Sequence, residues 1–330
     1  LCWVVVLCFV PAPFTVAYRR MIQGILIHGG LTRKVGMATL VRLAAVGIVL
    51  GAAAAGRIAG AIAGAMALSV AFAAEALAVR FMARRLMREL LAREVAADAA
   101  KMTLQRVWAF YFPLALTAVM FHSMPAMLAY FMARAPLAHE SIAILPIIQN
   151  FSFLFGCFVF AMQEVIISRG DGGTGEHAAL RRFMLYLCGA VILAQVVVLF
   201  TPLVRIIFFR FYQLPIEFSE IMIVPVRLSV VILVLFSWNV WQRAILIRAQ
   251  KTRPITWASL LDLGTVCAVM AAMMKMTAWS GVMCAVVAII CGRTAGISSL
   301  YRTYSRLQLS RLGPVDAVLI PSVDYEPVAE

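Results

Sequence analysis

Long apolar segments dominate the chain, and short polar segments, most of them basic, separate these segments from one another. A helix needs about 20 mainly apolar residues to cross the hydrocarbon core of a bilayer. The segments are too long and too evenly apolar for barrel strands, which alternate over about 9–11 residues. The pattern predicts an all-α polytopic membrane protein with transmembrane helices at residues 2–27, 36–55, 58–79, 106–132, 141–167, 183–202, 219–247, 255–274 and 280–299.

The composition supports this prediction. The chain has 330 residues, of which 64% are hydrophobic and 13% are charged, whereas a soluble domain has roughly 45–50% apolar and about 25% charged residues. This balance excludes a soluble enzyme and a disordered chain. The seven cysteines lie in apolar stretches without CxxC or CxxH spacing, so we expect neither a metal site nor a disulfide framework. We expect no cofactor, although transport coupled to H+ or Na+ is compatible with the sequence.

The basic residues predict how the chain is oriented in the membrane. The net charge is +14. With the nine spans above, 23 of the 29 Lys and Arg residues fall on one side and five on the other, while Arg227 lies within a span. Cytoplasmic loops carry the excess of Lys and Arg, so we expect a cytoplasmic C-terminus. Basic residues that flank spans set the orientation of the protein in the lipid bilayer, which we expect to be its partner. The positive charge therefore does not indicate binding of nucleic acid. We expect a monomeric, multi-pass protein of the bacterial inner membrane.

An internal repeat relates two parts of the chain. Residues 24–44 and 244–264 share eight of 21 residues without a gap, including a Thr-Arg pair in both turns. The two copies are six spans apart and therefore share one orientation in the membrane. Parallel repeats of this kind are typical of secondary transporters. The second six-span unit is complete, whereas the first has three spans, so the repeat predicts an N-terminally truncated chain and twelve spans in the whole protein.

The repeat and the basic segments predict four regions. Residues 1–79 would be the remainder of an N-terminal lobe with three spans, and residues 80–106 a cytoplasmic amphipathic linker helix. Residues 107–305 would form a C-terminal six-helix lobe, and residues 306–330 a cytoplasmic tail. Gly56, Gly60 and Gly64 have the spacing of closely packed membrane helices, so we expect close packing there.

Three short motifs carry a family resemblance: the two Thr-Arg turns, the segment Phe110-Tyr111-Phe112-Pro113-Leu114-Ala115-Leu116, and Val224-Pro225-Val226-Arg227 followed by an apolar run. Together with the repeat, they resemble the multidrug/oligosaccharidyl-lipid/polysaccharide flippase superfamily with its MATE-like fold, and most of all its progressive ankylosis-type branch. The resemblance implies rocking-bundle export of organic solutes or lipid-linked sugars. The ankylosis-type branch would imply small organic or phosphate-bearing anions.

Polar residues inside the spans are the candidate site residues, because an ionisable group at the centre of a membrane helix costs about 2.5–3.5 kcal/mol on insertion scales. Arg42 and Asp262 occupy matching positions of the repeat, so they could form a contact between the lobes, or each could be satisfied within its own bundle. We expect coupling or gating residues among His122, Glu75, Arg42 and Asp262, and a substrate path along Arg227, Gln149, Asn150, Gln163, Glu164 and Trp238. Packing, interfacial or ion-pair roles are the alternative for each.

The predicted function is secondary active transport of an organic, anionic solute by alternating access. A lipid-linked oligosaccharide flippase and a multidrug cation antiporter are the alternatives within transport. An enzyme is not expected, because the chain has no HExxH or GxSxG motif and no paired carboxylates. An intramembrane enzyme and a non-transporting scaffold remain the distant alternatives.

Overall fold

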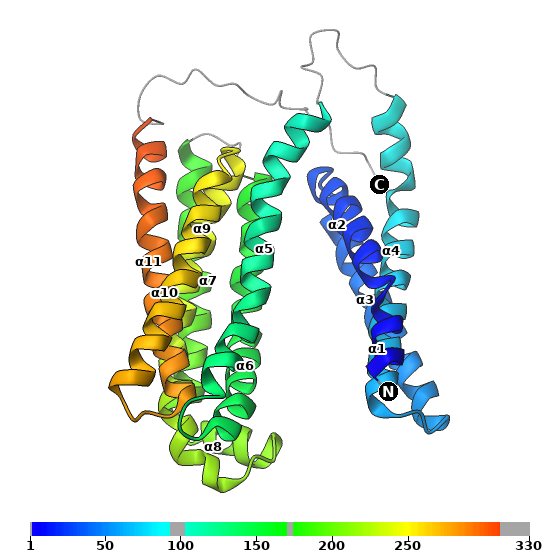
Figure 1. Cartoon of the computed structure of the whole chain (residues 1–330). Helices are drawn as coiled ribbons and strands as arrows, with labels where there is room; N and C mark the ends of the chain where they lie inside the picture. The colour runs from blue at the N-terminus through cyan, green and yellow to red at the C-terminus, as the bar shows by residue number, and fades with distance from the viewer. Residues whose placement is uncertain (1, 93–102, 170–173, 311–330) are drawn as a thin grey trace. The chain divides into compact units, whose positions relative to one another are not determined.

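The computed structural model describes residues 2–92, 103–169 and 174–310, and all regular structure within these ranges is helical. In this part of the chain, nine helical segments are long and apolar enough to cross a membrane. The predicted span count and the all-α class are thereby confirmed, and the chain is an integral multi-pass membrane protein. It divides into two compact units, unit 1 within Leu1–Lys101 and unit 2 within Met102–Val318, which are described separately below (Figure 1).

Unit 1 contains three spans. The first is divided into α1 (Cys2–Phe9) and α2 (Ala12–His28), because Pro11 and Pro13 lack the backbone N–H that a continuous helix requires. The other two spans are α3 (Thr32–Ala55) and α4 (Gly60–Ala92). The three spans pack around a small apolar core formed by Ile22, Leu26, Ala38, Val79, Ala83 and Leu86.

The predicted linker helix at residues 80–106 differs from the structure. Residues 80–92 continue α4 without a break, and residues 104–106 already belong to α5. The reason is local, since neither glycine nor proline occurs between residues 65 and 92 to end the helix. The middle of the predicted linker lies outside the described residues, and so does the predicted tail after residue 310.

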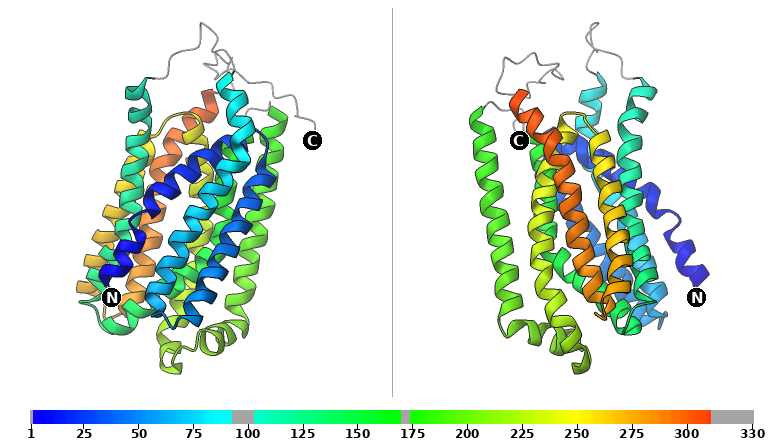
Figure 2. Two further views of the ribbon diagram at one scale, coloured as in Figure 1. Left: turned by 90° about the vertical axis from the view of Figure 1, so that its right-hand side faces the viewer. Right: turned by 60° about the vertical axis from the view of Figure 1, so that its left-hand side comes forward.

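Unit 2 is a bundle of six long helices that run alongside one another (Figure 2). They are α5 (Leu104–Met132), α6 (Ala138–Arg169), α7 (Thr174–Phe200), α9 (Ser219–Arg248), α10 (Arg253–Met276) and α11 (Gly281–Ser310). Between α7 and α9 lie α8 (Leu203–Arg205), the π-helical η1 (Ile206–Phe211) and the 3-10 turn η2 (Ile216–Phe218). Phe208 anchors this connection, because it is fully buried with its ring 5.0 Å from that of Phe151.

The backbone supports the repeat that the sequence indicates. In the turn after α2, three amides bond back to carbonyls of the helix: Gly29 to Ile25, Gly30 to Ile27 and Leu31 to Leu26. The turn after α9 has the same three bonds at the matching positions: Ala249 to Ile245, Gln250 to Ile247 and Lys251 to Leu246. The second residue before the Thr-Arg pair is glycine in one copy and glutamine in the other, yet both have the left-handed backbone conformation, with φ of 73° at Gly30 and 54° at Gln250.

The predicted close packing at the glycine ladder is not found. A Cβ atom added at Gly60 or Gly64 would have no atom of another helix within 4 Å in the described part of the chain. Close approach occurs instead on α11. A Cβ atom at Gly292 would lie 2.5 Å from Cγ2 of Val266 and 2.8 Å from the backbone oxygen of Asp262. Glycine spacing alone predicted the wrong helices, because it carries no information on which faces meet.

Candidate functional site: two buried charge clusters

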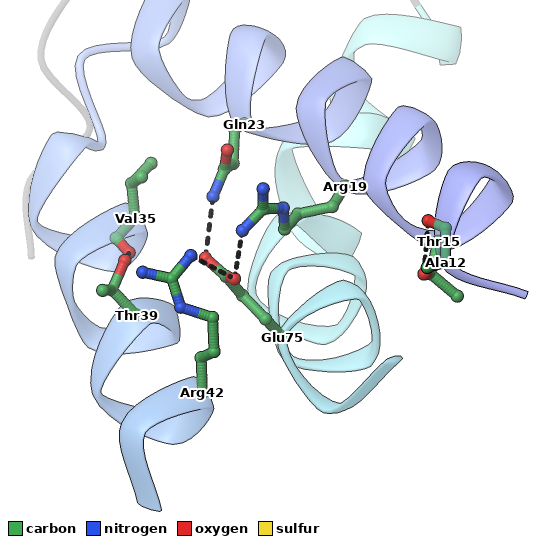
Figure 3. Close-up of polar contacts among 8 residues, drawn as sticks. All are labelled: Ala12, Thr15, Arg19, Gln23, Val35, Thr39, Arg42 and Glu75. Carbon is green, nitrogen blue, oxygen red and sulfur yellow. Dashed lines mark hydrogen bonds and ion pairs between the residues drawn. The ribbon is translucent and has the colours of Figure 1, made fainter. Parts of the chain in front are cut away.

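Glu75 on α4 is the centre of a buried polar cluster in unit 1 (Figure 3). Its carboxylate is 1% exposed and forms an ion pair with Arg19 of α2 through Oε2. Nη1 of Arg42, on α3, lies 3.4 Å from the same oxygen. Nε2 of Gln23 donates a hydrogen bond of 3.1 Å to Oε1. One carboxylate therefore joins α2, α3 and α4.

The Glu75 cluster carries a surplus positive charge. It contains two guanidinium groups, which stay protonated in proteins, against one carboxylate. Arg19 is buried, its guanidinium lies 5.6 Å from the ring centre of Phe72, and its Nε atom has no partner. The Arg42 side chain is 33% exposed and forms the accessible edge of the cluster. With Glu75 ionised, the net charge is +1 in a part of the protein that is otherwise apolar.

The cluster lies well inside the helices that carry it, several residues from the turn between α2 and α3. Arg19 lies nine residues before the end of α2, and Arg42 lies ten residues after the start of α3. At 1.5 Å per residue, both are about 14 Å from the turn that joins these helices. The cluster therefore lies within the apolar spans and not in the turn. Charged groups at this depth mark functional sites by default.

Unit 2 contains a second cluster around Asp262 of α10. Oδ2 of Asp262 lies 2.8 Å from Nη1 of Arg293 on α11, and both side chains are largely buried. Oδ1 is buried without a partner. Asp262 and Arg293 line a cavity of about 10 Å³ together with Asn239 and Arg243 of α9 and Ser259 of α10. This space holds about one water molecule.

The repeat relates the two clusters to each other. The offset that matches residues 24–44 with 244–264 also matches Arg19 with Asn239, Gln23 with Arg243 and Arg42 with Asp262. Each cluster contains two arginines, one carboxylate and one amide.

The acid and the base have exchanged helices between the two units. In unit 1 the carboxylate of Glu75 is on α4, the last of the three helices α2, α3 and α4. In unit 2 the carboxylate of Asp262 is on α10, the middle one of α9, α10 and α11. Aligning the helix starts Gly60 and Gly281 places Glu75 opposite Gly296, with Arg293 nearly one turn earlier on α11. The two units therefore carry a similar set of charged and amide groups at matching positions of the repeat.

Three of the predicted coupling residues therefore belong to clusters. Arg42 and Glu75 meet in unit 1, and Asp262 is the acid of unit 2. Each of them has a partner within its own unit, which is the second alternative that the sequence left open. A direct contact between Arg42 and Asp262 would join the two units and stays a prediction.

Arg227, a predicted path residue on α9, lies against the C-terminal end of α7. Its Nε atom donates a hydrogen bond of 3.3 Å to the backbone oxygen of Leu199, and its guanidinium lies 5.3 Å from the ring centre of Phe200. A cation near the last carbonyls of a helix is favoured by the helix dipole. The contacts give Arg227 a capping role, and its role in the path remains a prediction.

The remaining predicted residues lie outside the two clusters. On α6, Asn150 and Glu164 are exposed, whereas Gln149 and Gln163 are partly buried. His122 is exposed, with its ring 5.5 Å from that of Phe121. The ring of Trp238 lies 6.4 Å from that of Tyr304. The path and coupling roles of these residues stay predictions. A separate open groove of about 520 Å³ on α3 and α4 is bordered by Arg80 and Arg84 and includes neither Arg42 nor Glu75.

Sequence reasoning missed Arg19, Gln23, Arg243, Arg293 and Asn239. Arg19, Arg243 and Arg293 were counted with the basic side of the membrane and Gln23 and Asn239 were left unassigned, because span boundaries are uncertain by several residues. The signal was nevertheless present. Arg19 and Gln23 are four residues apart on one helical face, and the repeat offset maps them onto Asn239 and Arg243.

Comparison with known proteins supports the fold. A scan against protein-family models finds no match, and a search of curated proteins finds none either. Among solved structures, the chain is similar to a multidrug resistance MATE family transporter of the MOP superfamily in its outward-facing conformation. The TM-score is 0.72 at 16% sequence identity, and the match covers 94% of this chain and 70% of that one. The fold is therefore MATE-like, as the sequence resemblance implied. The ankylosis-type branch and the twelve-span total stay predictions.

Proposed function

We propose that the protein is a secondary transporter that moves an anionic organic solute across the membrane by alternating access of its two units. The MATE-like fold supports transport, because the similar solved structure with this fold is described as a transporter. The surplus of arginine over carboxylate in both clusters supports an anionic solute, and this is the observation that carries the proposal.

The charge argument depends on the low dielectric of the membrane interior. Two guanidinium groups face one carboxylate in each cluster, so an approaching cation meets a net repulsion and an approaching anion a net attraction. Such interactions are weakly screened away from water. Arginine also presents a planar fork of donors that matches carboxylate and phosphate groups. We infer that the solute carries at least one such group.

A multidrug cation exporter is the second candidate, since the similar structure is described as a multidrug resistance transporter. A lipid-linked oligosaccharide flippase is a third possibility within the superfamily. The net positive clusters favour an anion over a cationic drug. The proposal also includes three predictions made from the sequence: a cytoplasmic C-terminus, location in a bacterial inner membrane, and a monomeric state.

Uptake and efflux in proteoliposomes test the proposal. The panel consists of organic phosphates, citrate, cationic dyes and a lipid-linked sugar, each measured with and without proton and sodium gradients. We expect saturable transport of one of the anions and none of the dyes. Arg42→Gln, which leaves Glu75 paired with Arg19, should raise the KM for the anion roughly tenfold, equivalent to the loss of about 1.4 kcal/mol of binding.

Arg85→Gln is the matched control for this variant. Arg85 is an arginine of the same unit, but it is exposed and pairs with Glu89 on the surface of α4. We expect its KM to equal that of the wild type. Transport of the dyes alone, unchanged by Arg42→Gln, would contradict the proposal.

A further inference from the structure

We propose that Glu75 occupies the place of an anion between Arg19 and Arg42, so that a proton on Glu75 and an anion on the two arginines bind together. This inference rests on the transport function proposed above and makes it anion–proton symport, with the shared site in unit 1. The ligand class is a small organic anion that ends in a carboxylate, phosphate or sulfonate group.

The geometry shows what Glu75 does to the arginines. Its Oε2 atom forms ion pairs with both guanidinium groups, and its Oε1 atom accepts a hydrogen bond from Nε2 of Gln23. These are the donors that an external anion would need. The Glu75 carboxylate therefore occupies the position at which an external anion would bind, and an arriving anion must displace it from the two arginines. We assign the first contact of the anion to Arg42, since one third of its side chain is exposed whereas Arg19 and Glu75 are buried.

Electrostatics couples the displacement to a proton. Within unit 1, α2 directs Arg19 and Gln23 at Glu75, α3 directs Arg42 at it, and α1 contains no charged residue. Glu75 is thus the one acidic group among these partners in the described part of the unit. An ionised Glu75 would repel the incoming anion, and a protonated Glu75 would leave two guanidinium groups uncompensated until an anion arrives.

The two ligands consequently favour each other's binding, and by linkage the effect is reciprocal. The charge of the cluster is +1 with Glu75 ionised and the site empty of solute. It returns to +1 when one proton and one monovalent anion have bound. The loaded and unloaded sites therefore carry the same charge into the conformational change. On release, the anion leaves the arginines and the proton leaves Glu75 on the same side of the membrane.

The Asp262 cluster does not offer an equivalent site for a solute. Its cavity of about 10 Å³ holds a water molecule but no organic anion. The side chains of Asp262 and Arg293 are 9% and 12% exposed, so neither provides an accessible edge comparable to Arg42. The cluster of unit 2 therefore lacks a partly exposed arginine like Arg42 of unit 1.

The test uses the purified whole chain in detergent and two probes, methanesulfonate and sulfate. Their charge does not change between about pH 5 and pH 8, so any effect of pH on their binding belongs to the protein. Binding is measured by calorimetry at several pH values and in buffers of different ionisation enthalpy, which gives the number of protons taken up. We expect the affinity to rise by up to about tenfold per pH unit as the pH falls, with close to one proton taken up per anion.

Glu75→Gln imitates the protonated residue. We expect this variant to bind methanesulfonate as tightly at high pH as the wild type does at low pH, without proton uptake. In proteoliposomes it should exchange the anion but no longer accumulate it in response to a proton gradient. Glu89→Gln is the matched control, because Glu89 is an exposed carboxylate on the same helix. It should behave as the wild type does.

The outcomes separate the two proposals. Anion binding to the wild type without proton uptake would overturn the symport site and leave anion transport standing, and so would a Glu75→Gln variant with unchanged pH dependence. Absence of anion binding at every pH, together with transport of cations, would overturn both. If Glu75→Gln does not fold, the proton uptake of the wild type decides alone.

Discussion

Asp262→Ala is expected to lower the free energy of unfolding by about 3–5 kcal/mol, the cost of leaving a buried charge without its partner. Asp262 is buried and lies 2.8 Å from the guanidinium of Arg293, and Arg243 lines the same cavity. The substitution would leave two cations close together in an apolar environment. The loss is measured by chemical unfolding of the purified protein in mixed micelles.

A double variant distinguishes this cause from a cavity effect. Removing Arg293 as well, in Asp262→Ala/Arg293→Met, should recover a large part of the lost stability, because the uncompensated guanidinium is then gone. The exposed pair of Arg85 and Glu89 supplies the control, since Glu89→Ala should cost less than about 0.5 kcal/mol. A double variant as unstable as the single one would show that the ion pair is not the cause.

Gly292→Ala is expected to destabilise the protein by about 1–3 kcal/mol through overpacking. The added methyl group would lie 2.5 Å from Cγ2 of Val266, 2.6 Å from Oδ1 of Asp262 and 2.8 Å from the backbone oxygen of Asp262. The backbone oxygen cannot move aside as a flexible side chain can. Helices α10 and α11 would have to separate, which would also lengthen the contact between Asp262 and Arg293. Thermal unfolding in detergent measures the effect.

Gly264 provides the matched control for Gly292. It lies on α10, and a Cβ atom there would have no atom of another residue within 4 Å. Gly264→Ala should therefore be neutral or slightly stabilising, since alanine favours the helix by up to about 1 kcal/mol relative to glycine. Equal stability of the two alanine variants would contradict the close packing of α10 against α11.

The spans were predictable because membrane insertion imposes a length and a polarity that the sequence displays directly. The repeat was predictable because a backbone turn with fixed hydrogen bonds, such as that of Gly29–Leu31, preserves a local sequence pattern. The linker was less predictable. Whether α4 ends at residue 79 or continues to Ala92 depends on helix propensity beyond the membrane, where the hydrophobic pattern no longer discriminates.

The site was only partly predictable for a related reason. Arg42, Glu75 and Asp262 were identifiable as charges within spans, but their partners depend on which helix faces meet. Arg19 and Arg293 lie deeper in their helices than a count from the span ends suggested. Hydropathy cannot separate an arginine that reaches the membrane surface from one that pairs inside the bundle. Tertiary contacts decide that distinction.

The parallel six-span repeat is the basis of the paired clusters, and side-specific cysteine labelling tests it most directly. Single cysteines replace Arg33, Arg253 or Arg57, all exposed, in a chain whose seven cysteines have been changed to alanine. A membrane-impermeant maleimide is applied to vesicles of known sidedness. We expect Cys at positions 33 and 253 to react from the cytoplasmic side and Cys at position 57 from the opposite side. Labelling of positions 33 and 253 from opposite sides would contradict the parallel repeat and the equivalence of the two clusters.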